Sequence, residues 1–97
     1  MKIPKKLKVG GFDYDIIFDD KFVEKETLCG QHQPNRLKII LQTGVYNQQK
    51  IDQTFWHEVA HAISCVYLGE NEMTEDQIDN FSQGLYQVLK DNKFLKE

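Results

Sequence analysis

Cysteine is scarce in this chain of 97 residues, and its two cysteines, Cys29 and Cys65, stand far apart. They form no CxxC pair, so neither a disulfide framework nor a zinc site with four thiolates is indicated. Proline is equally scarce, and no segment repeats another or has low complexity. With 40% apolar and 28% charged residues, the composition is that of a folded chain rather than a disordered one. We therefore expect a single domain over residues 1–97.

Long apolar segments are also absent. No run approaches the roughly 18 residues that a membrane-spanning helix needs, and the start of the chain lacks the apolar stretch of a secretion signal. We therefore expect a cytoplasmic protein without membrane contact. The formal net charge of −3 gives no general attraction to phosphate backbones, so nucleic-acid binding is not expected either.

The strand-rich part of the chain is residues 1–43. A first β-hairpin is predicted because apolar residues recur at every second position on both sides of Gly10-Gly11. The alternating residues are Leu7, Val9, Phe12, Tyr14, Ile16 and Phe18.

A second hairpin is predicted from Leu28 to Gln33 and from Arg36 to Gln42, joined by the turn signal Pro34-Asn35. Its alternation directs three residues to the core: Leu37, Ile39 and Leu41. The segment from Lys21 to Thr27 indicates no particular element.

Two helices are predicted in the rest of the chain. Asn47 is a suitable N-cap, and neither Gly nor Pro interrupts the chain before Gly69, so the first helix spans about residues 47–68. Thr74 to Gln77 fits a capping box and begins a second helix at about 75–91. Its apolar face consists of Ile78, Phe81, Leu85, Val88 and Leu89. The predicted fold class is α+β: a small antiparallel sheet of two N-terminal hairpins packed on two C-terminal helices.

A metal-binding motif lies inside the first of these helices, at His57-Glu58-Val59-Ala60-His61. Residues four apart share one helix face, so His57 and His61 can bind the same ion. Glu58 lies about 100° round the helix, where a carboxylate can reach a water on the metal without ligating the metal itself. This HExxH spacing predicts one Zn²⁺ per chain, with Glu58 as the general base.

The third ligand is not fixed by the motif. Cys65 shares the stripe of the two histidines but lies about 12 Å along the helix from His57, too far to bind the same ion. A carboxylate of the second helix is therefore favoured. Glu75 is the preferred ligand because it lies about 80° from the centre of that helix's apolar face, against about 120° for Asp79. The alternatives left open are Asp79, Asp76, the loop residues Glu70 and Glu72, Cys29 and a ligand from outside the protein.

The remaining histidine, His32, stands beside the Pro34-Asn35 turn. It could donate a hydrogen bond to an oxyanion, but a histidine next to a turn is more often an exposed surface residue. We assign it no role.

The motif and its surroundings resemble a known group of proteins. The segment from Thr54 to Ile63, followed by a helix that begins with acids and contains Leu85 to Leu89, is similar to small zincin-like proteins of phages and mobile elements. These are similar to a minimal core of the ImmA/IrrE-type metallopeptidases. The resemblance implies a gluzincin-like site, with an acid of the following helix as third ligand. In one matching of the two helices that acid falls on Gln77, a poor zinc ligand, so either Glu75 serves instead or the site is incomplete.

Two functions follow from these observations. The first is a zinc-dependent metallopeptidase that hydrolyses a peptide bond in a specific protein, with Glu58 activating the zinc-bound water. An extended peptide substrate could then pair with an edge strand near Arg36 to Gln42. The alternative is a non-enzymatic protein-binding module in which zinc is structural. A site with an open coordination position favours the first function, and a closed site with four protein ligands favours the second.

Overall fold

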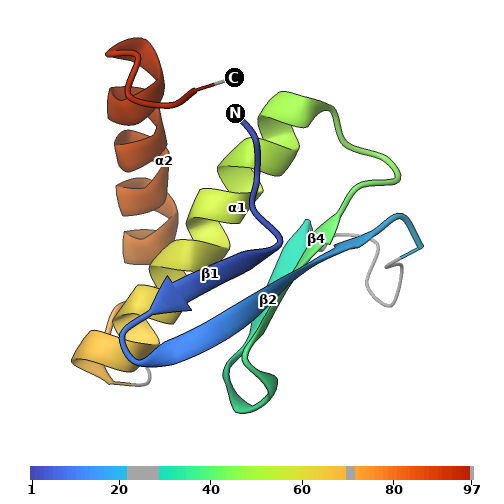
Figure 1. Cartoon of the computed structure of the whole chain (residues 1–97). Helices are drawn as coiled ribbons and strands as arrows, with labels where there is room; N and C mark the ends of the chain where they lie inside the picture. Colours follow the sequence, from blue (N-terminus) through green and yellow to red (C-terminus); the bar gives the residue numbers. More distant parts are fainter. Residues whose placement is uncertain (22–28, 70–71, 97) are drawn as a thin grey trace.

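The computed structural model describes residues 1–21, 29–69 and 72–96. It has a four-stranded sheet in its N-terminal part and two helices in its C-terminal part, which confirms the α+β class (Figure 1). No helix among these residues is both long and apolar enough to cross a membrane. The elements, in chain order, are β1 (Lys6–Val9), β2 (Phe12–Asp19), β3 (Gly30–Gln33), the 3₁₀ turn η1 (Pro34–Arg36), β4 (Lys38–Gln42), α1 (Gln48–Ile63), the π-helical turn η2 (Ser64–Leu68) and α2 (Glu75–Asp91).

Both predicted hairpins form. β1 and β2 pair antiparallel, and their turn contains Gly10 at a φ of 61°, which glycine adopts at little cost. β3 and β4 also pair antiparallel, and η1 makes the turn between them. Leu28 and most of the segment from Lys21 to Thr27 lie outside the described residues.

The prediction of a purely antiparallel sheet is wrong. The strand order is β1-β2-β4-β3, and β2 runs parallel to β4, with Ile16 opposite Ile39. The composition of the two strands explains their positions. β4 contains the apolar run Ile39 to Leu41, which suits a central strand, whereas β3 has the sequence Gly-Gln-His-Gln, which suits an edge strand. β4 is therefore an interior strand. The edge strand expected near Arg36 to Gln42 is instead β3.

The core lies between one face of the sheet and α1, which lies across it in Figure 1. Its buried residues come from three strands and from α1: Val9, Tyr14, Ile16, Ile39, Leu41, Ile51, Phe55, Val59 and Ala62. Leu37, expected in the core, is only partly buried and takes a left-handed φ of 53° after η1. The core-facing side of α1 fixes the rotation of the helix, and this rotation turns its polar stripe toward β3.

The ends of the helices have the caps that the sequence predicts. The Asn47 side chain accepts a hydrogen bond from the N–H of Lys50 and begins α1. Helical backbone continues through η2 to Gly69, whose N–H donates to the carbonyl of Ser64. In α2, the Thr74 hydroxyl accepts from the N–H of Gln77 while the Gln77 side chain accepts from the N–H of Thr74, a complete capping box. Gln77 is thereby held at the cap of α2.

The second helix packs beside α1, on the left of Figure 1. Ile78 and Ser82 are its two fully buried side chains, and they face α1. Phe81 and Val88, on the predicted apolar face, are 58% and 47% exposed. Much of this apolar face is therefore not covered by the described part of the chain.

Candidate metal centre

The two motif histidines lie on the polar stripe of α1 and point to the same side. Their ring centroids are 4.9 Å apart, and both side chains are mostly buried. The four-residue spacing on a regular helix accounts for this placement.

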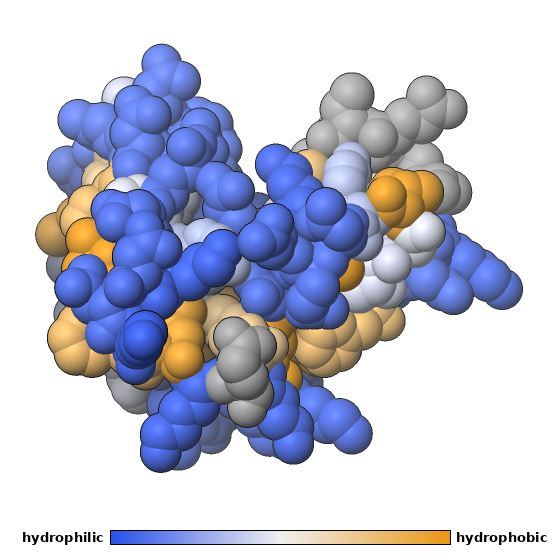
Figure 2. Space-filling model, turned by 90° about the horizontal axis from the view of Figure 1, so that it is seen from above, coloured by the Kyte–Doolittle hydropathy of each residue, from blue (hydrophilic) through white to orange (hydrophobic). Residues whose placement is uncertain are grey.

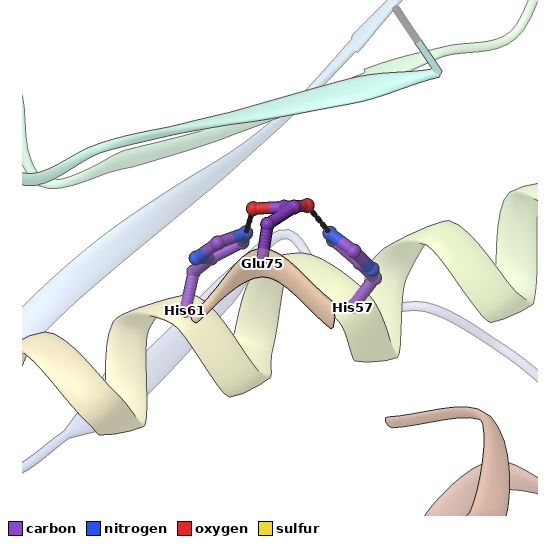
Figure 3. A group of neighbouring side chains, drawn as sticks. All are labelled: His57, His61 and Glu75. Atoms are coloured by element: carbon purple, nitrogen blue, oxygen red, sulfur yellow. Dashed lines mark hydrogen bonds and ion pairs between the residues drawn. The ribbon is translucent and has the colours of Figure 1, made fainter. Parts of the chain in front are cut away.

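Glu75, the first residue of α2, completes a group with these histidines. Its two carboxylate oxygens lie 2.8 Å from Nε2 of His57 and 3.0 Å from Nε2 of His61, so the carboxylate bridges the two rings (Figure 3). One donor atom from each of the three residues lies within 4.8 Å of the other two. The structure thus brings together the three residues that the sequence favoured as ligands.

The other carboxylates considered take different positions. Asp79 lies with Oδ1 3.3 Å from Nδ1 of His57, the ring nitrogen that does not face Glu75. Asp76 and Glu72 are exposed and belong to no described group of metal donors. Glu70 lies outside the described residues. Glu75 is therefore the acid that faces the Nε2 atoms of both histidines.

The donor set fits zinc. Two imidazoles and one carboxylate are a frequent set in catalytic zinc sites, where ligand distances are about 2.0 to 2.2 Å. Ligands of a tetrahedral ion at those distances lie roughly 3.3 Å apart, so the group needs only a small adjustment to enclose one. The adjustment is easy because the Glu75 side chain is largely exposed and can rotate.

Glu58, next to His57 in the chain, has a carboxyl group with unusual surroundings. The side chain is only 7% exposed, and burial together with the nearby charge of Glu75 raises its pKa to about 8. The backbone N–H of His32 donates to this carboxyl group and partly opposes the rise in its pKa. A raised pKa is typical of carboxyl groups that act as general bases in active sites. Glu58 also lies beside the three residues that could hold a metal ion.

A cleft of about 500 Å³ contains these groups and lies between α1 and β3. Its walls are formed by Gly30, Gln31 and His32 of β3, by the stripe of α1 from Lys50 to His61, and by Glu75 and Asp79 of α2. Gly30 is needed for the close approach of the two elements. A Cβ there would lie 2.8 Å from Cγ2 of Thr54 and 3.3 Å from Cγ of Glu58.

His32 was expected to be an exposed residue, and that expectation is wrong. Its ring is partly buried, with Nε2 2.8 Å from the hydroxyl of Tyr14, and it stacks at 6.5 Å and 7° on the ring of His61. Burial, and secondarily His61, lower its pKa. Tyr14 had been named only among the alternating residues of the first hairpin. Ile39 faces the core, and its cross-strand partner His32 therefore lies on the same face of the sheet, toward α1. The sequence predicts this position of His32 only when the register between β3 and β4 is already known.

Comparison of the chain with models of known protein families, with curated proteins and with solved structures found no match. The resemblance to ImmA/IrrE-type metallopeptidases therefore stays a prediction. The evidence for function is the geometry and chemistry of the cleft.

Proposed function

We propose that this protein is a zinc-dependent metallopeptidase acting on a protein or peptide substrate. The observation that carries the proposal is the position of Glu58, a buried carboxyl group with a raised pKa, next to the group of His57, His61 and Glu75 in one cleft. A helix that only needed to bind metal would have no use for a buried carboxyl group at this position.

Each residue then has a defined task. A zinc ion bound here would supply Lewis acidity, which would polarise a peptide carbonyl and lower the pKa of water. His57, His61 and Glu75 would hold the ion through Nε2, Nε2 and the carboxylate. The Asp79 carboxylate, 3.3 Å from Nδ1 of His57, favours a proton on Nδ1 and so keeps Nε2 free of its proton for the metal. Glu58 would be ionised beside the bound cation, and its carboxylate would take a proton from the attacking water and give it to the leaving amide nitrogen.

The edge of β3 is suited to hold the substrate. The N–H of Gln42 donates to the carbonyl of Cys29, so the alternation of an antiparallel ladder directs the backbone groups of Gly30 and His32 away from β4. The N–H of His32 donates to Glu58, which leaves the groups of Gly30 and the carbonyl of His32 for a substrate. Among the described residues no strand pairs with that edge. An extended peptide added there would run along the cleft, past Glu58 and the metal ligands.

The alternative of a structural zinc site is less well supported. A structural site is closed by four protein ligands, whereas the group contains three donors among the described residues. Asp79 lies beside Nδ1 of His57, not beside the Nε2 that faces Glu75, so it is not placed to serve as a fourth. The arrangement favours an open coordination position and hence catalysis.

The experiment that tests the proposal is cleavage of a peptide library derived from a whole proteome, read by mass spectrometry. The zinc-loaded protein should generate new peptide ends, and Glu58→Gln should slow their formation by roughly 100- to 10,000-fold while still binding zinc. Glu72→Gln, which removes an exposed carboxyl group outside the cleft, is the matched control and should cleave normally. Equal cleavage by Glu58→Gln, or no cleavage by the zinc-loaded wild type, would contradict the proposal.

A further inference from the structure

An apolar surface lies along α2 and continues onto the neighbouring turns of α1 and η2. We call it the α2 patch and define it by the residues Ile63, Leu68, Phe81, Leu85 and Val88. Phe81 and Val88 are two turns apart on one face of α2, and Leu85 lies between them beside an apolar hollow that Trp56 and Met73 also line. In Figure 2, hydrophobic side chains reach the surface on the left, the side on which Figure 1 shows α2. Exposed apolar surfaces of this kind mark interaction sites.

Gly84 is the second unusual feature of this surface. It stands in the middle of α2, where glycine destabilises a helix relative to alanine. A Cβ at this position would meet no atom within 4 Å, so nothing in the described chain requires a glycine there. Gly84 lies three residues after Phe81 and four before Val88, on the same side of the helix. A small residue at this place allows the backbone of another helix to approach closely.

We propose that a second copy of this chain covers the α2 patch, with the two α2 helices packed antiparallel about a two-fold axis between Gly84 and Leu85. In that register Phe81 lies opposite the partner's Val88, and Leu85 lies opposite the partner's Gly84. Each contact occurs twice, as a two-fold interface requires. The large residues of one helix therefore meet the smaller residues of the other. This complementarity favours a second copy over an unrelated protein.

Charge also favours the antiparallel arrangement. The first turn of α2 carries Glu75 and Asp76, whereas its last turn carries Lys90 beside Asp91, and Lys93 follows just beyond the helix. In the antiparallel arrangement the acidic first turn of each α2 lies at the partner's end that carries Lys90, and the two helix dipoles run in opposite directions. A parallel pair would bring the two acidic turns together.

The size of the patch is sufficient for a dimer. Its exposed side chains amount to roughly 400 to 500 Å² of apolar surface, within the range of the largest patches on monomers, which often have a function. A specific interface buries about 800 Å² per partner, of which about 60% is apolar, so the patch supplies the apolar part. The hollow beside the patch shares no lining residue with the metal cleft. Dimerisation leaves that cleft open and does not depend on the proposed peptidase activity.

Sedimentation velocity over micromolar to millimolar chain concentrations tests the proposal, both with zinc and with a chelator present. The wild type should form dimers in both conditions, and Phe81→Glu should raise the dissociation constant about 100-fold or more, because it buries an unpaired carboxylate twice per dimer. Phe18→Glu is the matched control, since Phe18 is 45% exposed at the end of β2 far from the Gly10-Gly11 turn and η2, and should leave the dimer unchanged. A monomeric wild type, or equal effects of the two variants, would overturn the proposal.

The register is tested by a charge pair. Val88→Lys should also be monomeric, but mixing it with Phe81→Glu should restore a heterodimer, because one Glu–Lys pair and one native Phe–Val pair then form. Gly84→Gln provides a second test that does not depend on the folding of the charged variants. It adds a good helix former in open space, so circular dichroism should show a folded helix while the dimer is lost. A mixture that stays monomeric, or a Gly84→Gln dimer as tight as the wild type, would contradict this arrangement.

Discussion

Asp79 Oδ1 lies 3.3 Å from Nδ1 of His57, on the opposite edge of the ring from the Nε2 that faces Glu75. Metal-binding histidines usually donate their other ring N–H to a carboxylate or a carbonyl, which fixes the tautomer and the orientation of the ring. Glu75 and Asp79 are thus one turn apart on α2 and contact the same imidazole, but with different tasks.

This difference predicts different zinc affinities for two variants. Glu75→Gln removes a ligand and should abolish stoichiometric zinc binding, whereas Asp79→Asn should weaken it by roughly 10- to 100-fold. Competition with a chromophoric chelator measures both affinities. Asp76→Asn is the control, because Asp76 is an exposed neighbour on α2 and belongs to no described group of donors. If Asp79→Asn binds zinc as tightly as this control, Asp79 does not orient His57.

Local signals predicted most of the fold. The alternation around Gly10-Gly11 and the turn at Pro34-Asn35 predict both hairpins, because a hairpin is specified by residues close in sequence. The order of the strands joins distant segments, as in the parallel pairing of Ile16 with Ile39. No turn encodes that pairing, and the apolar run from Ile39 to Leu41 was its only sign.

In the candidate site, too, the sequence predicts the residues that are related by local spacing but not the contacts between distant segments. His57, Glu58 and His61 are related by helical spacing alone, and Glu75 followed from its angle on the second helix. The contact between Tyr14 and His32 depends on the register of β3 with β4 and on the place of β4 beside β2, so the sequence did not reveal it. The exposure of Phe81 was also not predictable, because an apolar face has the same pattern whether its own chain or a partner covers it.

Glu58 predicts how the stability of the chelated protein depends on pH. Its pKa is about 8 in the folded chain, against 4.5 for an ordinary glutamate, so the folded chain holds a proton that the unfolded chain releases. The free energy of unfolding should therefore fall as the pH rises from about 4.5 to about 8. Glu58→Gln lacks this group and should be more stable than the wild type at pH 8, by at most about 3 to 5 kcal/mol, and nearly equal at pH 4.5.

Urea unfolding at both pH values, with a chelator present, measures this effect. Glu72→Gln removes an exposed carboxyl group and is the control. A gain in stability from Glu58→Gln that is the same at both pH values would show that its cause is not the ionisation of Glu58.

Gly30 predicts a steric effect on the wall of the cleft. A Cβ at this position would lie 2.8 Å from Cγ2 of Thr54 and 2.9 Å from the carbonyl oxygen of Ile40, so β3 would have to move away from α1 or β4. Gly30→Ala should lower the free energy of unfolding by about 1 to 3 kcal/mol. Gly11→Ala is the matched control, because a Cβ there meets no atom within 4 Å, and it should change stability by less than about 0.5 kcal/mol. Equal stabilities of the two variants would mean that β3 does not lie so close to α1.

The hydrogen bond between Tyr14 and His32 gives the last prediction. The Tyr14 side chain is buried in the core, and its hydroxyl is 2.8 Å from Nε2 of His32, a partly buried nitrogen. Tyr14→Phe keeps the ring but removes the partner of that nitrogen, so it should lower the free energy of unfolding by about 1 to 2 kcal/mol. Tyr67→Phe removes a hydroxyl from an exposed ring and should have almost no effect. Urea unfolding compares the two variants, and nitrogen NMR of His32 reports the tautomer that the Tyr14 hydroxyl selects. A Tyr14→Phe protein as stable as Tyr67→Phe, with unchanged His32 resonances, would show that this hydrogen bond does not form in solution.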